Sequence, residues 1–456
     1  MGSNWKTARL LDQYDVRSGL SKPAKDFGTG FPFLTFKDVF YNYFTPEVLG
    51  DLVESTDKER DGCSVKRGDV FLTRTSETMN ELGMSCVALK DYEGATFNGF
   101  CKRLRPNEQC DLVPEYVGYY LRSPKFRQAM LAFSTMSTRA SLNNEMIGRL
   151  EISYPPKEAQ RHIAHVLKTL DNKITLNCQI NQTLEQMAQA LFKSWFVDFD
   201  PVVDNALDAG FFEQNSELSE ALLRRAEQRK AVREQPNFKP LPAETRQLFP
   251  AAFEACEEPS LGLSGWVPKG WGVLQLSKIA KIASGMRPPI KGSLKTKEEP
   301  IPVWGGNGIK WFTSMPLSTD NYIITGRVGT LGTVYKVSGQ SWASDNALTV
   351  RPVADELFDF VYQILSGFDI ASLNSGSTQP LVTQTALGSI QFVFPNNSNL
   401  LFEYQRQADA CNEKYLLNSG EVDILTELRD TLLPKLISGE LRLNDDGTLA
   451  SDNTDC

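Results

Sequence analysis

Two stretches decide the fold: STRASLNNEMIGRLEISYP at residues 137–155 and STQPLVTQTALGSIQFVFP at residues 377–395. At a constant offset of 240 residues they share an initial Ser-Thr pair, one glycine and a final proline. Where identity is lost, apolar residues are still matched by apolar residues. Self-similarity at a fixed distance indicates a duplicated structural unit. The chain is therefore predicted to contain two copies of one domain.

The repeat extends toward the N-terminal side of both stretches. At an offset of 266 residues the matched landmarks are Trp5, Leu10, Ser18, Gly19 and Pro23 with Trp271, Leu276, Ser284, Gly285 and Pro289. Offsets that change along a repeat are expected where loops of different length join equivalent elements. Short strands, Gly/Pro/Ser turns and brief helices within each copy predict an α+β fold.

A long helical pattern follows the closing strand of each copy, over residues 157–196 and 401–433, and Pro434 interrupts the second one. Steps of three and four residues give a coiled-coil seam that is apolar at its ends and polar in its middle. The predicted core of the helix pair is Ile163, Val166, Leu170, Leu184, Leu191, Tyr415, Val422, Leu425 and Leu432. The chain is thus predicted to contain two α+β domains, each followed by one long helix of a coiled-coil pair.

Three asparagines, Asn177, Asn181 and Asn418, lie near the middle of these helices. In an antiparallel pair they could meet in the seam, where a buried asparagine fixes the register at a cost in stability. Solvated asparagines on a polar stretch are an equally good interpretation. Forty helical residues span roughly 60 Å, which is long enough to hold two domains apart.

The formal net charge of −8 is unevenly distributed. Residues 197–260 carry 13 acidic and 7 basic side chains, residues 441–456 carry 4 and 1, and the remainder has a net charge of +1. We interpret residues 197–265 as an acidic, solvated connector with some helix. The predicted order is domain 1 at 1–155, helix 156–196, connector 197–265, domain 2 at 266–398, helix 399–440 and tail 441–456.

Several classes of protein are disfavoured by the residues present. The eight cysteines form no C-x-x-C pair, and the two histidines, His162 and His165, have no ligand partners nearby in sequence, so no metal site is expected. No apolar run approaches the roughly 18 to 20 residues of a membrane span, and no signal peptide is evident. We also find no phosphate-binding glycine motif and no catalytic loop.

Polar and basic loop residues in both domains fit a DNA interface, because Lys, Arg, Ser and Thr hold phosphates while Arg, Asn and Gln read base edges. The candidates are Lys37, Arg74, Thr75, Ser76, Arg103, Ser137, Thr138, Arg139, Trp304, Asn307, Arg327, Trp342, Asn346, Ser377, Thr378 and Gln379. Residues 352–405 contain no Lys or Arg, so phosphate contacts of domain 2 are expected between residues 278 and 351.

Three further stretches resemble one known family. QINQTLEQMAQALFKSWFVDFDPV at residues 179–202 resembles the central conserved region of type I restriction-modification specificity (S) subunits. VPKGWGVLQLSKIAKIASG at residues 267–285 and LRDTLLPKLISGEL at residues 428–441 are similar to the start of their second target recognition domain and to their distal conserved region. With the repeat, the resemblance covers nearly the whole chain.

The fold that the resemblance implies is two pseudo-symmetric α/β target recognition domains separated by two long antiparallel helices. The resemblance also implies a non-catalytic subunit that recognises a split double-stranded DNA site, one half per domain, with the helices setting the spacer. It implies a cytoplasmic complex with two methyltransferase (M) and two restriction/translocase (R) subunits. No cofactor or metal is expected in this chain, and S-adenosylmethionine, ATP and Mg belong to the partners. A coiled-coil scaffold and a single-chain DNA-modifying enzyme are the alternatives. The DNA sequence recognised does not follow from the resemblance.

Overall fold

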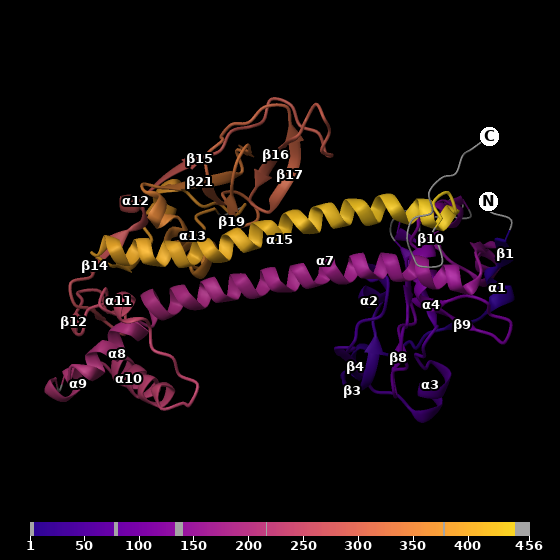
Figure 1. Ribbon diagram of the computed structural model, residues 1–456, viewed down its shortest axis with the longest axis horizontal. Coiled ribbons are helices and arrows are strands. Elements are labelled where there is room, and N and C mark those ends of the chain that lie inside the picture. Colours follow the sequence, from indigo (N-terminus) through magenta and orange to yellow (C-terminus); the bar gives the residue numbers. More distant parts are fainter. Residues whose placement is uncertain (1–3, 77–80, 133–139, 216, 377–378, 443–456) are drawn as a thin grey trace. The chain divides into compact units, whose positions relative to one another are not determined.

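The computed structural model describes residues 4–76, 81–132, 140–215, 217–376 and 379–442 (Figure 1). The chain divides into two compact units. The first consists of Met1–Gln179 and Asn418–Cys456, and the second consists of Ile180–Leu417. Each unit therefore holds one α+β domain and one portion of each long helix.

The domain of the first unit contains two larger sheets and two strand pairs, β1 with β11 and β6 with β10. A four-stranded sheet has the order β2-β9-β5-β7, a three-stranded sheet has the order β4-β3-β8, and β1 pairs with β11. The strands are β1 (Lys6–Arg9), β2 (Tyr14–Ser18), β3 (Phe27–Leu34), β4 (Asp51–Val53), β5 (Val70–Thr73), β6 (Thr75–Ser76), β7 (Ser85–Val87), β8 (Thr96–Phe97), β9 (Cys101–Pro106), β10 (Ala140–Ser141) and β11 (Glu151–Tyr154).

Short helices connect or cover these strands. They are α1 (Leu10–Gln13), α2 (Phe36–Tyr41), α3 (Asp57–Gly62), α4 (Pro114–Tyr120), α5 (Pro124–Ala132) and α6 (Asn144–Arg149). Tyr116, Val117 and Tyr119 of α4 are buried in the main core of this unit. They share that core with Ile163 and Leu167 of the first long helix.

The domain of the second unit repeats this topology. Its four-stranded sheet has the order β15-β21-β18-β19, its three-stranded sheet the order β17-β16-β20, and β14 pairs with β22. The strands are β14 (Gly272–Gln275), β15 (Ala280–Ser284), β16 (Ile301–Gly305), β17 (Gly308–Thr313), β18 (Tyr322–Gly326), β19 (Val334–Val337), β20 (Trp342–Ala343), β21 (Ala347–Pro352) and β22 (Gln391–Phe394).

The helices of this domain are α12 (Leu276–Ile279), α13 (Phe358–Gly367) and α14 (Gln384–Gly388). In both domains the inner strand of the small sheet pairs with one neighbour antiparallel and the other parallel. Equal strand order and equal pairing directions confirm the predicted duplication and the α+β class.

Two long helices run through both units: α7 (Lys157–Phe192), which continues into a π-helical turn at Lys193–Val197, and α15 (Ser398–Ser438). In the first unit Asp171 of α7 pairs with Arg429 of α15, and Lys173 pairs with Glu421. Rising numbers on α7 thus meet falling numbers on α15, so the pair is antiparallel as predicted. Pro434 lies inside α15 and does not end it.

The predicted seam residues face inward to different degrees. Ile163 is buried, and the other eight predicted core residues are half-buried. The three asparagines are buried, with 1%, 9% and 2% of Asn177, Asn181 and Asn418 exposed. In the first unit the Asn177 amide donates to Glu421 Oε2 at 2.8 Å, and in the second unit that of Asn181 donates to the Tyr415 carbonyl at 3.3 Å. The solvated interpretation is therefore wrong.

Residues 197–265 differ from the predicted solvated connector. They form α8 (Asp200–Asp208), α9 (Phe211–Gln214), α10 (Glu220–Arg233), α11 (Ala243–Arg246) and β12 (Phe253–Ala255), which pairs with β13 (Trp266–Pro268). Phe199, Val202, Leu222 and Phe249 belong to the same buried core as Trp271 of the second domain. This segment is therefore a folded part of the second unit.

Ion pairs explain why the acidic composition of residues 197–265 led to the wrong prediction of a solvated connector. Asp200, Asp204 and Asp208, one helical turn apart on α8, pair with Arg225, Arg229 and Arg233 on α10. The Arg229–Asp204 and Arg233–Asp208 contacts are both 2.6 Å. The prediction failed because a charge count does not show which carboxylates are neutralised by distant arginines.

Candidate nucleic-acid interface

Two arginines occupy equivalent positions in the two domains. Arg74 follows β5, where its N–H donates to the Phe100 carbonyl at 2.7 Å and its carbonyl accepts from the Leu142 N–H at 2.8 Å. Arg327 follows β18, where its N–H donates to the Asn346 carbonyl at 2.9 Å and its carbonyl accepts from the Val382 N–H at 2.9 Å. The same backbone pattern therefore holds an arginine at the same sheet edge in each domain.

The edge around Arg74 gathers several loops of the first domain. The N–H of Asn98 donates to the Leu34 carbonyl, just before α2 begins, and that of Gly99 donates to Leu20. β6, which starts at Thr75, pairs with β10. Loops that follow β3, β5 and β8 are thus brought together, which gives a surface built from segments far apart in sequence.

The predicted DNA contacts of the first domain are placed differently from one another. Lys37 on α2 and Arg74 are exposed, Thr75 is half-buried, and the backbone of Ser76 belongs to β6. Ser137, Thr138 and Arg139 lie outside the described residues. Exposed Lys37 and Arg74 meet the first requirement of a phosphate contact, which is access to solvent.

Arg103 is a correction to the sequence prediction, which placed it in a reading loop. It lies in β9 with 5% of its surface exposed. Its guanidinium donates to the Ser64 carbonyl at 2.7 Å and packs over the Phe97 ring. A buried guanidinium held by backbone carbonyls stabilises the end of α3 and is not available to DNA.

In the second domain Asn307, Asn346 and Gln379 are exposed, and Arg327 and Trp304 are half-buried. Asn307 lies in the two-residue turn between β16 and β17. The Trp304 ring packs against Tyr335 with 5.6 Å between the ring centroids. Ser377 and Thr378 lie outside the described residues.

Trp342 is the second correction. It is 7% exposed in β20, and its indole N–H donates to the Met286 carbonyl at 2.7 Å. A tryptophan whose ring is buried and whose donor is satisfied supports the loop that begins at Met286. It has no free group with which to contact a base.

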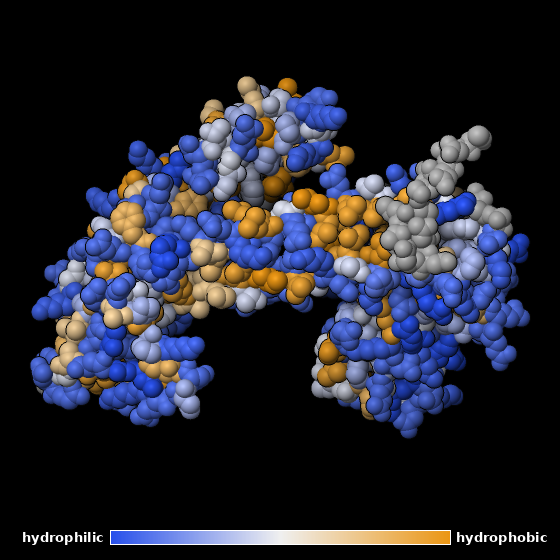
Figure 2. Space-filling view, in the orientation of Figure 1, coloured by the Kyte–Doolittle hydropathy of each residue, from blue (hydrophilic) through white to orange (hydrophobic). Residues whose placement is uncertain are grey.

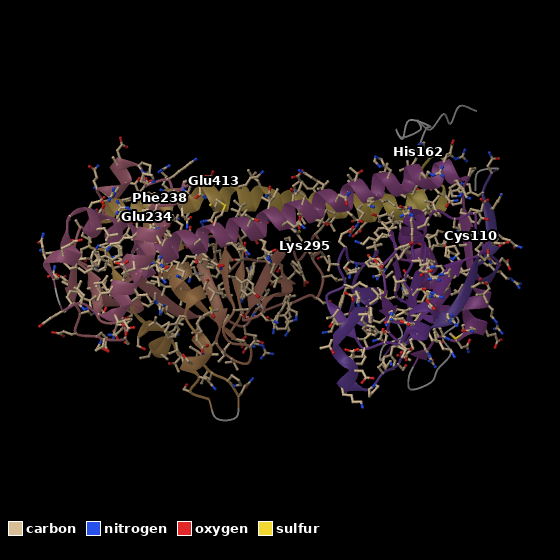
Figure 3. All side chains as sticks on the ribbon, turned by 90° about the horizontal axis from the view of Figure 1, so that it is seen from below. Cys110, His162, Glu234, Phe238, Lys295 and Glu413 are labelled. Carbon is tan, nitrogen blue, oxygen red and sulfur yellow. The ribbon has the colours of Figure 1, made fainter. Side chains whose placement is uncertain are left out.

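The sequence analysis expected the phosphate contacts of this domain between residues 278 and 351, but it did not name the basic surface next to this loop. The segment between β15 and β16 carries Arg287, Lys291, Lys295 and Lys297, and Lys310 lies on the neighbouring β17. Among the described residues none of these five has an ion-pair partner. Reciprocal hydrogen bonds of 2.9 Å join Gly292 to Phe312, which fixes the segment beside β17. Lys295 is labelled in Figure 3.

One signal for this surface was present in the sequence. Four basic residues stand within residues 287–297, in contrast to the Lys- and Arg-free residues 352–405. The missing information was spatial, because residues 197–260 also hold seven basic residues. Several of those, including Arg225, Arg229 and Arg233, are paired with aspartates.

In the first domain Lys102 and Arg74 form a pair of basic residues at the edge described above. Lys102 lies two residues after Phe100, and its ammonium donates to Ser18 Oγ at 3.0 Å. Burial and the nearby positive charge of Arg74 lower the pKa of Lys102. Two like charges held together without an acidic partner form a site that attracts an anion such as a phosphate.

The two histidines of the chain lie on α7. His162 and His165 line an open groove of about 720 Å³ together with Arg67, Arg161 and Lys168. His162 is labelled on α7 in Figure 3. Within the described residues no group of three or more His, Cys, Asp or Glu side chains is arranged to hold a metal. None of the described helices has the length and apolarity of a membrane span.

Comparisons with known proteins agree with this architecture. The sequence model of the type I restriction modification DNA specificity domain matches residues 2–186 and 268–410. The type I restriction enzyme HindI specificity subunit of Haemophilus influenzae is 28% identical over 407 residues, which cover 83% of this chain and 87% of that protein. The MjaIX specificity subunit of Methanocaldococcus jannaschii is 23% identical, with 97% and 94% covered.

A solved structure is also similar. The S subunit of a type I restriction-modification system from M. genitalium superposes with a TM-score of 0.53 at 15% sequence identity. The superposition covers 96% of this chain and 97% of that one. At this identity the match concerns the fold, and it supports the arrangement of a repeated α+β domain with two long helices.

Proposed function

The chain belongs to the type I restriction modification DNA specificity family and is a DNA-recognising, non-catalytic component, and we propose that it reads a bipartite site with one half-site per domain. The proposal assigns residues 1–155 and 266–398 to the two target recognition domains. Its main support is the equivalent placement of Arg74 and Arg327 at one edge of each repeated sheet. Two copies of one reading edge suit a target with two separate halves.

Phosphate and base contacts divide between different side chains in this proposal. In the second domain Arg287, Lys291, Lys295, Lys297 and Lys310 hold phosphates, because these cations are without acidic partners in the described structure. Asn307, Asn346 and Gln379 face solvent and carry amides that pair with adenine edges. In the first domain Lys37, Arg74 and Lys102 take the phosphate role.

The helix pair sets the spacer between the half-sites. The 36 residues of α7 extend about 54 Å at 1.5 Å per residue. Half-sites one turn of DNA apart are separated by roughly 34 Å, which such a helix spans. The buried asparagines support this role because a polar residue in a helix seam specifies its register.

Apolar residues on the outer surface of the helices suit docking of partner subunits. In the first unit Leu176, Ile424 and Leu428 are 50%, 68% and 43% exposed. In the second unit Met187, Leu416 and Leu417 are 55%, 58% and 70% exposed. Figure 2 shows hydrophobic surface in orange along the long helices. Exposed apolar patches mark protein interfaces. We assign these surfaces to the docking of two methyltransferase subunits, and two restriction subunits complete the complex. The partner subunits carry S-adenosylmethionine, ATP and Mg, and the complex acts in the cytoplasm.

The decisive experiment maps the methylated positions in DNA from cells that carry this chain with its methyltransferase subunits. We expect one sequence with two conserved halves and a fixed spacer. Exchange of residues 266–398 for those of another family member should change one half and preserve the other. Changes in both halves would contradict the assignment of one half per domain. Methyl transfer by this chain alone would contradict its non-catalytic role.

A second experiment tests the basic surface. Replacement of Lys291, Lys295 and Lys297 by Gln should weaken DNA binding of the assembled complex. The slope of log binding constant against log salt concentration should fall by about 0.9 per lost phosphate contact. The matched control is Lys239→Gln, which replaces an exposed lysine of the folded segment 197–265. An unchanged slope in the triple variant would contradict the phosphate role.

A further inference from the structure

The first domain presents an exposed aromatic ring on a well-anchored loop. Phe100 lies between β8 and β9 with 62% of its surface exposed. Its N–H donates to Asn98 Oδ1 at 2.8 Å, and its carbonyl accepts from the Arg74 N–H at 2.7 Å. The neighbouring Cys101 N–H donates to the Asn98 carbonyl at 2.9 Å. The backbone is therefore held on both sides of a residue whose ring faces solvent.

Two basic residues adjoin Phe100 along the backbone. Arg74, whose N–H donates to the Phe100 carbonyl, is exposed between β5 and β6, and Lys102 follows Phe100 by two residues. Neither has an ion-pair partner among the described residues. An apolar group framed by unpaired cations matches a DNA groove, where phosphates flank the base edges.

The second domain shows which kind of residue this position holds. Asn346 occupies the place of Phe100, because its carbonyl accepts from Arg327 as that of Phe100 accepts from Arg74. The following Ala347 N–H donates to the Ser344 carbonyl, as Cys101 does to Asn98. An exposed amide at one copy and an exposed ring at the other fit a position whose side chain changes with the base that it contacts.

We propose that Phe100 is a specificity-determining residue that contacts the C5 methyl group of a thymine in the half-site bound by the first domain. The thymine methyl is the apolar group that a base pair presents in the major groove. The equivalent Asn346 contacts a base of the other half-site through its amide. This inference rests on the proposed function, since it identifies a residue of the same interface.

The test uses the complex of this chain with its methyltransferase subunits and DNA that contains the mapped site. Each thymine of the first half-site is replaced in turn by deoxyuridine, which removes only the methyl group. At one position the wild-type complex should bind about fourfold more weakly, as expected for one methyl group. Phe100→Ala should weaken binding to unmodified DNA at least as much, and deoxyuridine at that position should then have no further effect.

Two controls separate this role from others. Phe27→Ala removes a ring that is 40% exposed at the start of β3, whereas Leu34 at its other end adjoins the reading edge. It should leave all deoxyuridine effects unchanged. Asn346→Ala should relax only the second half-site.

The inference is overturned if, at every thymine, deoxyuridine weakens DNA binding by the wild type and by Phe100→Ala equally. An absence of weakening at all thymines of the first half-site would overturn it as well. It is also overturned if Phe100→Ala lowers binding to all sequences by one common factor, which would indicate a contact with a partner subunit. Failure of the proposed function itself would appear earlier, as the absence of a bipartite methylated site with the wild-type chain.

Discussion

Glycine-to-alanine substitutions at Gly19 and Gly285 test the equivalence of the two reading edges. A Cβ atom at Gly285 would lie 2.2 Å from the Ser344 carbonyl oxygen, and one at Gly19 would lie 2.2 Å from that of Asn98. Ordinary van der Waals contact begins near 3.4 Å. Because the atom met in both cases is backbone, the strand segment carrying it must move by about 1.2 Å.

The expected cost follows from what that movement breaks. In the second domain Gly285 donates to Ala347 at 3.0 Å and Met286 donates to Ala343 at 2.9 Å. Loss of both backbone bonds costs about 2 kcal/mol. Overpacking of a close contact adds about 1 to 3 kcal/mol. Gly285→Ala should therefore lower the free energy of unfolding of its unit by about 3 to 5 kcal/mol, with the same range for Gly19→Ala.

The assay combines thermal unfolding with methylation mapping of the assembled complex. For a unit of this size each kcal/mol lowers Tm by about 2 to 4 °C, so a decrease of roughly 6 to 20 °C is expected. Gly19→Ala should relax the first half-site and Gly285→Ala the second. The controls are Gly50→Ala and Gly272→Ala, since no heavy atom lies within 4 Å of a Cβ at either position.

Two results would refute this reasoning. If the variants at Gly19 and Gly285 unfold at the same temperature as the controls, the contact is relieved without breaking the backbone bonds. If each variant alters both half-sites, the two edges do not act independently.

Three further predictions concern stability. Asp359→Asn removes the charge that pairs with Lys336 from a side chain that is only 1% exposed. Chemical denaturation should show that the free energy of unfolding falls by about 3 kcal/mol, and a decrease below about 1 kcal/mol would contradict this prediction. A hydrogen bond from Arg233 lowers the pKa of Asp208 from its usual 3.8. The contribution of Asp208 to the free energy of unfolding should therefore be present above about pH 4 and lost as the pH falls further. Asp208→Asn should make the free energy of unfolding depend less on pH in this acidic range. Asn177→Leu should raise the free energy of unfolding by about 1 kcal/mol, because Glu421 stays half-exposed and paired, and a decrease in denaturant midpoint would argue for a net stabilising bond.

Local patterns in the sequence were sufficient for the repeated domain and the helix pair. The match of Gly19 with Gly285 was visible at a fixed offset, and the two long helices followed from three- and four-residue spacing. Family resemblance was sufficient for the DNA-recognition role. Periodicity and repetition are properties of the linear order of residues, so they can be recognised in a single sequence.

Solvent exposure could not be predicted in the same way. Arg103 and Trp342 have the chemistry of DNA contacts, yet both are buried, while Phe100 has the chemistry of a core residue and is exposed. Which side chain faces solvent depends on strands paired across long sequence distances. The bonds from Arg74 to Phe100 and to Leu142 are examples.

The sequence by itself determined the two domains, the two helices that join them and the family to which the chain belongs. The tertiary structure decided how residues 197–265 fold and which cations remain unpaired. The physical reason is that a charged side chain is available to a ligand only when no opposite charge in the folded protein neutralises it. Asp204 is neutralised by Arg229, 25 residues away along the chain. Among the described residues Lys295 has no acidic partner and stays available to a phosphate.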